Sequence, residues 1–299
     1  MASTITYKQC PCCGSNNIKP QLVAKDYTVS NQSFDIWHCH NCTVRFTQNV
    51  PDEDSIGSFY QSTNYVSHSD THEGLINNLY HRVRKRTLLQ KSELIIDACK
   101  TANGVLLDVG SGTGAFAQTM IEAGWKVTGL EPDETARTVA INKYGLQLDD
   151  PKILFDLPQN TFDAITMWHV LEHVHNLHGY LDQYQKILKP EGKLIIAVPN
   201  YTSSDATAYN EYWAAYDVPR HLYHFSPESM TKLADLKGFK IETYEPMWYD
   251  SLYVSMLSEK YKNGKGNLPM AVINGLISNL KASKNYKLCS SVIYVMSKR

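Results

Sequence analysis

The sequence contains no long apolar run. No stretch approaches the roughly 20 apolar residues that a membrane-spanning helix needs, although 43% of the 299 residues are hydrophobic. The opening Met1-Ala-Ser-Thr-Ile-Thr-Tyr-Lys8 has no apolar core of a signal peptide. An excess of one sign of charge is also missing, because 29 Lys and Arg stand against 30 Asp and Glu. We therefore expect a cytoplasmic globular protein with no membrane and no nucleic-acid partner.

The sequence also has few cysteines: there are seven, an odd number. Together with the absence of a secretion signal, this number disfavours a disulfide framework. Four of the seven form two C-x-x-C pairs separated by about 25 residues, the spacing of a four-thiolate zinc ribbon. The expected ligands of this structural zinc ion, within a ribbon over residues 1–50, are Cys10, Cys13, Cys39 and Cys42. Cys12 is a spare thiol that replaces Cys10 if the turn is shifted, and His38 and His40 are lesser alternatives.

Two short alternating segments lie between these pairs, Lys25 to Val29 and Ser33 to His38. Both are expected to be strands, which a metal ion can hold together where so small a core cannot. Few basic residues lie near the cysteines, so nucleic-acid binding by the ribbon is the less favoured interpretation.

The most informative stretch runs from Gly104 to Glu131. Val105 to Val109 is a short apolar run typical of a buried parallel strand. The turn Gly110-Ser-Gly-Thr-Gly114, a helix from Ala115 to Ala123 and a second strand ending at Leu130 follow. In such a β-α-β unit Glu131, just after the second strand, can accept both ribose hydroxyls of an adenosine held over the turn.

Two classes of ligand fit this turn. Gly110, Gly112 and Ala115 satisfy the dinucleotide fingerprint, which predicts a nicotinamide or flavin enzyme. Asp108 argues against it, because a carboxylate beside the turn repels a pyrophosphate but tolerates a zwitterionic amino-acid group.

Asp108-x-Gly110-x-Gly112-x-Gly114 resembles the first motif of class I S-adenosylmethionine-dependent methyltransferases. Further motifs follow in the order and spacing seen in the quinone-biosynthesis O-methyltransferases: Phe162-Asp163, Leu171-Glu172-His173, Leu188-Lys-Pro-x-Gly192 and Val198-Pro-Asn200. With the ribbon, the chain is also similar to zinc-ribbon C-methyltransferases of sugar and polysaccharide pathways.

This resemblance implies an α/β fold: a Rossmann-like, seven-stranded sheet over residues 101–299 with helices on both faces, and a helical insert at about 249–280. It implies S-adenosylmethionine as cofactor and a small-molecule acceptor, for which a sugar or polysaccharide precursor is one candidate. The implied cofactor contacts are Tyr65, Asp108, Gly110, Ser111, Gly112, Gly114, Glu131, Pro132, Asp150, Trp168 and His169.

Residues 51–100 are expected to form a Tyr-rich linker and a long helix that cover the cofactor. The Tyr60-x4-Tyr65 pair resembles a lid, with aromatic packing as the alternative. The basic stretch of the helix, Arg82 to Arg86, is expected to be mainly a solvated face.

A methyltransferase needs a base only when its acceptor loses a proton, and histidine suits that task near neutral pH. The candidates are His169, His173, His221 and His224. His169 and His173 share one face if a helix begins early enough, but a metal site there is disfavoured because no third ligand is evident. The rival from another class is a cofactor-binding protein without catalysis. The acceptor, the methylated atom and the oligomeric state are left open.

Overall fold

The computed structural model of the protein describes residues 3–60 and 75–299. They fall into two compact units, which are interleaved along the chain. Unit 1 comprises Met1–Tyr65, His169–Gly179 and Ile196–Tyr294, and unit 2 comprises Val66–Trp168, Tyr180–Ile195 and Val295–Arg299. Tyr65 lies outside the described residues, so its expected role as part of a lid stays a prediction.

One sheet of six strands carries the Rossmann-like topology, in the order β11-β12-β9-β8-β6-β7. Its strands are β6 (Val105–Val109), β7 (Lys126–Leu130), β8 (Phe162–Trp168), β9 (Leu188–Pro199), β11 (Phe239–Pro246) and β12 (Ser291–Lys298). The sheet has six strands where the resemblance implies seven, and the strand expected from Ser291 to Met296 is present within β12. The missing strand is the short one expected from Gly145 to Asp150, which contributes a single bridge, between Asp149 and Leu130. Pairing stops there because Asp150 caps a 3-10 helix, η2 (Pro151–Asp156), whose proline has no N–H to donate.

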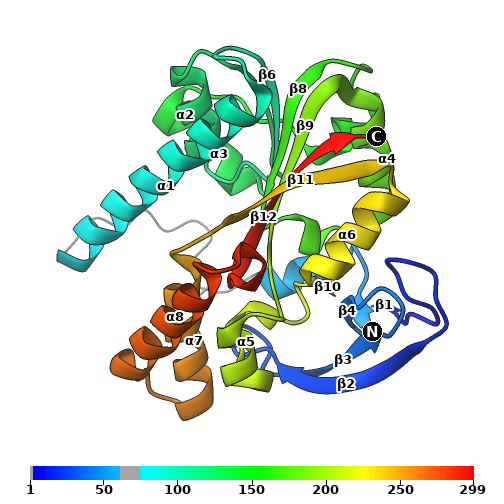
Figure 1. Ribbon diagram of the computed structural model, residues 1–299, viewed down its shortest axis with the longest axis vertical. Helices are drawn as coiled ribbons and strands as arrows, with labels where there is room; N and C mark the ends of the chain where they lie inside the picture. Colours follow the sequence, from blue (N-terminus) through cyan, green and yellow to red (C-terminus); the bar gives the residue numbers. More distant parts are fainter. Residues whose placement is uncertain (1–2, 61–74) are drawn as a thin grey trace. The chain divides into compact units, whose positions relative to one another are not determined.

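In unit 2, β6 pairs in parallel with both β7 and β8. Leu106 and Leu107 are fully buried, which is why this strand reads as a continuous apolar run. The helices of this part of the chain are α1 (Leu75–Cys99), α2 (Ala115–Glu122), α3 (Glu134–Tyr144) and α4 (Leu177–Ile187). Figure 1 shows α2 and α3 together on one side of these strands.

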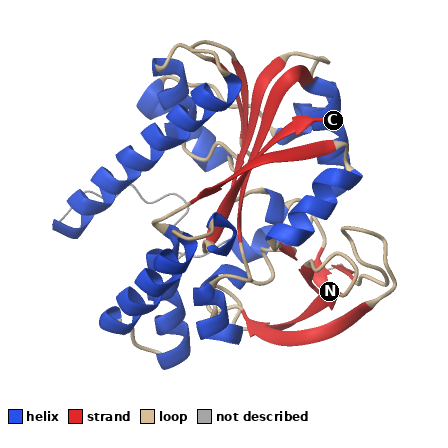
Figure 2. Cartoon of the chain, in the orientation of Figure 1, coloured by secondary structure: helices blue, strands red, loops and turns tan. Residues whose placement is uncertain are grey.

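In unit 1, the cysteine-bearing segment forms an antiparallel sheet in the order β10-β4-β3-β2. Its strands are β2 (Ile18–Lys25), β3 (Ser33–Cys39), β4 (Arg45–Thr47) and β10 (Tyr223–His224). Figure 2 shows β2 and β3 as its two long strands. A further pair joins β1 (Thr4–Ile5) to β5 (Val50–Pro51).

The strand expected from Lys25 to Val29 is wrong, because β2 ends at Lys25. The Asp26 carboxylate accepts hydrogen bonds from the N–H groups of Thr28, Val29 and Ser30 at 2.7–3.1 Å. These bonds offer the backbone a turn in place of a sheet partner.

The rest of unit 1 is mainly helical. The insert expected at about 249–280 forms α7 (Asp250–Asn263) and α8 (Leu268–Ala282). The other helices are α5 (Ser204–Tyr209), α6 (Pro227–Leu236) and the short 3-10 turns η1 (Ile56–Tyr60), η3 (Leu171–His173), η4 (Asn210–Tyr212), η5 (Ala214–Tyr216) and η6 (Tyr286–Leu288). Among the described helices, none combines the length and apolarity needed to cross a bilayer.

Candidate functional site

The glycine turn of unit 2 connects β6 to α2. The N–H groups of Gly110 and Ser111 both donate to the carbonyl oxygen of Leu130, at 2.8 and 2.9 Å, which ties the turn to the end of β7. Gly112 has a φ of +54°, and no described atom lies within 4 Å of where its Cβ would stand. Gly114 has a φ of +78° and approaches Ala140 closely. The turn therefore needs glycine for its conformation and leaves room above Gly112 for a ligand.

Asp108 lies just before this turn and is 1% exposed. Its Oδ1 accepts a hydrogen bond from Thr166 Oγ1 at 2.8 Å. Its Oδ2 is buried and has no hydrogen-bond partner within residues 3–60 and 75–299. Burial raises the pKa of the Asp108 carboxyl to about 6. A buried carboxylate with one unpaired oxygen fits a ligand that carries a positively charged amino group.

Glu131 follows β7 and is 6% exposed. Its carboxylate accepts from the N–H of Gly112 at 2.7 Å and from the N–H of Asp133 at 3.0 Å. These bonds fix the carboxylate beside the glycine turn, as the β-α-β interpretation requires.

Pro132 and Asp150, two further predicted cofactor contacts, are engaged in local hydrogen bonds. Arg137 Nη1 donates to the carbonyl oxygens of Glu131 and Pro132 at 2.6 and 2.9 Å. Asp150 caps η2 by accepting from the N–H of Lys152 at 2.9 Å. Asp150 is thus occupied by its own helix, although the carbonyl of the preceding residue, Asp149, accepts from the N–H of Glu131 at 2.9 Å.

Trp168, the last residue of β8, is the remaining predicted cofactor contact in unit 2. Its ring meets that of Phe116 edge-on at 5.4 Å, and Lys91 Nζ lies 4.2 Å from its centroid. Its Nε1 is buried and lacks a hydrogen-bond partner in the described part of the chain. From the same helix as Lys91, Arg84 Nη2 lies 3.5 Å from Thr113 Oγ1 in the glycine turn. Helix α1 therefore borders the glycine turn and Trp168, and its basic residues are not all solvated.

Residues 80–244 match the family of methyltransferase domains, more than half of the chain. The protein belongs to this methyltransferase family. The match decides between the two interpretations of the glycine turn: the cofactor is S-adenosylmethionine, and a nicotinamide or flavin enzyme is not supported.

Curated relatives agree with this assignment. The chain is 28% identical over 167 residues to a demethylmenaquinone methyltransferase of Tropheryma whipplei, covering 50% of this chain and 69% of the relative. It is 28% identical over 162 residues to the human mitochondrial ubiquinone biosynthesis O-methyltransferase, covering 48% of this chain but only 44% of the relative.

Among solved structures, geranyl diphosphate C-methyltransferase from Streptomyces coelicolor A3(2) has a similar fold, with a TM-score of 0.53 at 13% identity. The alignment covers 78% of this chain and 88% of that one. At this identity the likeness concerns the fold alone.

The methyltransferase carries a buried cluster of titratable side chains in unit 1. Ligand atoms of Glu172, His173 and His221 lie within 4.8 Å of one another. Glu172 is 1% exposed, and both of its carboxylate oxygens lack a hydrogen-bond partner among the described residues. The third member of this cluster is His221, which is 48 positions from His173 in the chain. The sequence alone did not show that it lies beside the Leu-Glu-His motif.

The hydrogen bonds of the two histidines fix their tautomers. His173 Nδ1 lies 3.0 Å from the carbonyl oxygen of Arg220, which can only accept, so Nδ1 carries the proton. Tyr60 Oη also lies 3.0 Å from this Nδ1. His221 Nδ1 donates in the same way to the carbonyl oxygen of Ala215 at 2.9 Å. In the neutral form of the His173 ring, Nε2 is left as the proton acceptor.

The surroundings of His173 and His169 shift their pKa values in opposite directions. Burial and the neighbouring His221 lower the pKa of His173 to about 4, so it is neutral at pH 7. Burial alone would also lower the pKa of His169, but the carboxylates of Asp250 and Glu172, at 2.9 and 3.5 Å, raise it instead to about 10. A protonated His169 is a poor base at neutral pH.

The helix that would align His169 with His173 does not begin early enough. His169 has a φ of +58°, and only the three-residue turn η3 follows. The two rings consequently make different contacts and do not act as a pair.

His224 lies in β10 and belongs to the cysteine-bearing sheet. Its Nε2 lies 3.1 Å from Thr47 Oγ1 and its ring packs against Tyr216. Burial and the neighbouring His221 and Arg45 charges lower its pKa well below the usual value. The contacts of His224 are those of a packed residue in the sheet.

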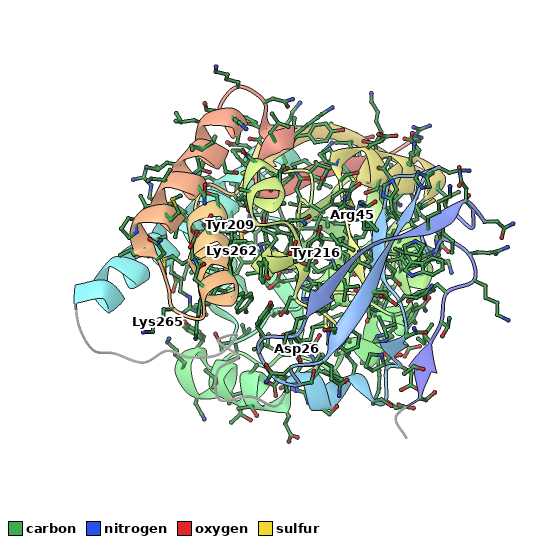
Figure 3. All side chains as sticks on the ribbon, turned by 90° about the horizontal axis from the view of Figure 1, so that it is seen from below. Asp26, Arg45, Tyr209, Tyr216, Lys262 and Lys265 are labelled. Carbon is green, nitrogen blue, oxygen red and sulfur yellow. The ribbon has the colours of Figure 1, made fainter. Side chains whose placement is uncertain are left out.

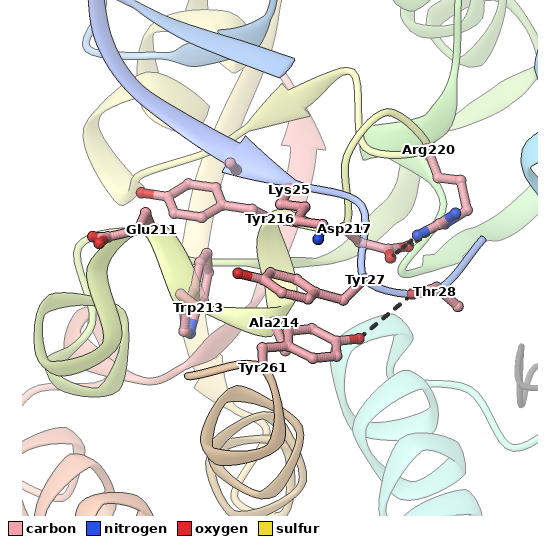
Figure 4. Close-up of a pocket in the computed structure, with 11 residues that line it drawn as sticks. Lys25, Tyr27, Thr28, Glu211, Trp213, Ala214, Tyr216, Asp217, Arg220 and Tyr261 are labelled. Atoms are coloured by element: carbon pink, nitrogen blue, oxygen red, sulfur yellow. Dashed lines mark hydrogen bonds and ion pairs between the residues drawn. The ribbon is translucent and has the colours of Figure 1, made fainter. Parts of the chain in front are cut away.

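A small pocket, with room for about one water molecule and otherwise open to solvent, is shown in Figure 4. Its aromatic residues are Tyr27, Trp213, Tyr216 and Tyr261, and its charged residues are Lys25, Glu211, Asp217 and Arg220. The rings of Tyr27 and Tyr261 stack at 4.5 Å. Asp217 Oδ2 lies 3.9 Å from His221 Nε2, so this residue contacts both the pocket and the cluster. Residues Glu211 to Asp217 supply much of the pocket wall, and Lys25 and Tyr27 of the ribbon, for which the sequence gave no such signal, supply another part.

The four predicted zinc ligands come together, with Sγ atoms within 4.8 Å of one another. The Cys10–Cys42 and Cys13–Cys39 sulfurs are 3.5 and 3.6 Å apart. Cys12 is buried but lies outside this group. The two knuckles end in residues of positive φ, Gly14 and Thr43.

Proposed function

We propose that this methyltransferase modifies a small acceptor with hydroxyl groups on a ring, and that sugar or polysaccharide precursors are the first class to test. The observation that carries the proposal is the buried histidine cluster, which Asp217 and Arg220 connect to the small pocket of Figure 4. The partly exposed rings of Tyr27 and Tyr261 beside it favour a ring-shaped acceptor, and the charged residues of its lining favour a polar one. Quinone-pathway relatives support a phenol as the second class to test.

The cofactor would be held by unit 2. Bound S-adenosylmethionine supplies a methyl group on a sulfonium, already activated for transfer. Asp108 would accept from its amino group and Glu131 from its ribose hydroxyls, while the turn of Gly110, Ser111, Gly112 and Gly114 leaves space for close approach. Tyr65, Pro132, Asp150, Trp168 and His169 remain proposed as surrounding contacts.

His173 would be the base that takes the acceptor's proton. It is neutral at pH 7, its Nδ1 proton is held by Arg220, and its Nε2 is the acceptor. The buried Glu172 carboxylate, which already faces His169 at 3.5 Å, would also stabilise the imidazolium that forms on His173. His221 would assist by position, and His169 would stay protonated.

The test is a screen for S-adenosylhomocysteine formation with nucleotide sugars and small phenols, in buffer with and without chelator. For any acceptor found, His173→Gln should lower kcat by about 100-fold or more, as loss of a general base does. His178→Gln is the matched control, because its ring only bonds the Pro11 carbonyl at 3.0 Å. Equal losses in both variants would refute a base at His173. Loss of activity in chelator, in a chain that keeps its four-thiolate zinc by elemental analysis, would assign the cluster to a cation.

We further propose a structural zinc ion at Cys10, Cys13, Cys39 and Cys42. A tetrahedral ion with Zn–S bonds of about 2.3 Å separates its sulfurs by about 3.8 Å. The 3.5 and 3.6 Å separations support that geometry.

A further inference from the structure

Helix α8 presents its large apolar side chains outward. Its buried residues are the small ones: Ala271, Gly275, Ser278 and Ala282. Spaced at 100° per residue, the exposed apolar residues lie on the opposite side of the helix, and we call them the outer face of α8: Met270, Val272, Ile273, Leu276, Ile277 and Leu280. Leu276 is 50% and Leu280 67% exposed. This is the reverse of an ordinary surface helix, which turns its apolar stripe to the core.

The contacts on the inner side fix this orientation. A Cβ on Gly275 would stand 2.7 Å from Leu252 Cδ2 and 3.1 Å from its Cα, so α7 and α8 approach closely at this point. Ser278 Oγ donates to Asp205 at 2.6 Å, and Asn274 Nδ2 donates to the Tyr209 hydroxyl at 3.0 Å. Rotating α8 to bury its leucines would break these bonds, so the apolar face is held outward.

The surface beside this face is basic. Residues 250–289 contain six lysines, Lys260, Lys262, Lys265, Lys281, Lys284 and Lys287, against two acids. All six lysines are exposed, and Figure 3 labels Lys262 and Lys265 near the turn between α7 and α8. Both acids point to partners within the unit: Asp250 bonds His169 at 2.9 Å, and Glu259 accepts from Tyr209 at 3.1 Å. The segment thus carries a net charge of +4, whereas the whole chain carries −1.

We propose that the outer face of α8, with the lysines around it, docks on a bilayer surface that contains anionic phospholipids. An apolar stripe flanked by lysines suits the interface between headgroups and acyl chains. A second copy is a poorer occupant, because symmetric pairing would set one lysine cluster against another. The expectation of no membrane partner rested on the absence of a spanning run, which an interfacial helix does not need. This inference does not depend on the acceptor.

The experiment is cosedimentation of the full chain with phosphatidylcholine vesicles, with and without about a third of phosphatidylglycerol. Binding to the anionic vesicles should be at least tenfold tighter and should weaken with salt. Leu276→Glu with Ile277→Glu should lower the affinity more than tenfold. Lys262→Gln with Lys265→Gln should lower it by roughly fivefold per lysine.

The matched control is Leu236→Glu with Lys240→Gln, both exposed and outside this surface. It should bind like the parent chain, and thermal melts should show all variants folded. Equal binding to neutral and anionic vesicles would overturn the proposal. So would binding to neither, or a dimer in analytical ultracentrifugation that the Leu276→Glu and Ile277→Glu changes dissociate in the absence of lipid.

Discussion

At the scale of single residues, Glu131 tests the cofactor assignment. Glu131→Ala would remove two charge-assisted bonds to ribose, each worth roughly 1.5–3 kcal/mol. We expect S-adenosylmethionine affinity to fall by at least about tenfold, measured by calorimetry. The change also frees the N–H groups of Gly112 and Asp133, so the free energy of unfolding should fall by about 1–3 kcal/mol.

Glu122→Ala is the control for this change, since Glu122 is exposed on α2 and bonds only Gln118 among the contacts described. It should leave affinity unchanged. Parent-like affinity in a folded Glu131→Ala protein would place the cofactor elsewhere.

His169 gives a pH prediction at the same scale. Asp250 and Glu172 raise its pKa from 6.5 to about 10, so its contribution to stability is complete below pH 6.5 and is lost as the pH rises toward 10. Asp250→Asn should bring the pKa of His169 down and flatten this dependence. Ring titration by NMR and urea melts across that interval measure both effects, and an unchanged titration in the variant would exclude Asp250 as the cause.

At the scale of elements, the cysteine-bearing sheet should depend on its metal. Elemental analysis of protein purified without chelator should find one zinc per chain. Cys10→Ser should lower the melting temperature and promote zinc loss, because the ion replaces the core that this small sheet lacks. Cofactor binding should persist, since Asp108 and Glu131 belong to the other unit. Ser substitution of Cys12, outside the ligand group, should retain the zinc.

At the scale of the molecule, Arg220 joins distant parts of unit 1. It is 1% exposed and bonds Asp217 at 2.6 Å, Asp26 at 3.1 Å and the Phe59 carbonyl at 2.9 Å. Asp26→Ala removes one partner of a buried ion pair, so the free energy of unfolding should fall by about 3–5 kcal/mol in denaturant melts.

This network also makes the stability of the protein fall at acid pH. Burial opposes charge on Asp26, but hydrogen bonds from Ser30 and the Arg220 charge lower its pKa below 3.8. Its contribution is therefore present above about pH 4 and is lost as the pH falls through the lowered value. In the Asp26→Ala chain, the free energy of unfolding should be lower at neutral pH than in the parent chain, and it should fall less steeply as the pH is lowered. A variant as stable as the parent chain at neutral pH would show that Asp26 is dispensable.

The sequence by itself determined what depends on contacts between near neighbours. The strand, glycine turn, helix and second strand around Gly112 occur where predicted, because turn conformation, capping and an apolar run are local properties. The two insert helices are local in the same sense. The four cysteines predicted as zinc ligands could also be identified from the sequence, since each C-x-x-C pair forms a local turn.

Only the tertiary structure decided which distant groups meet. Asp108 contacts Thr166 across 58 positions, and Tyr60 reaches His173 across 113. No periodic pattern encodes such pairs. The sequence named His173 and His221 as candidate bases but did not place them together beside Glu172, and it gave no sign of the ribbon's share of the pocket. Packing and capping also overrode the sequence pattern. The strand expected from Gly145 to Asp150 did not form, because Asp150 caps η2. Helix α8 turns its small residues inward, because α7 approaches too closely at Gly275 for a side chain.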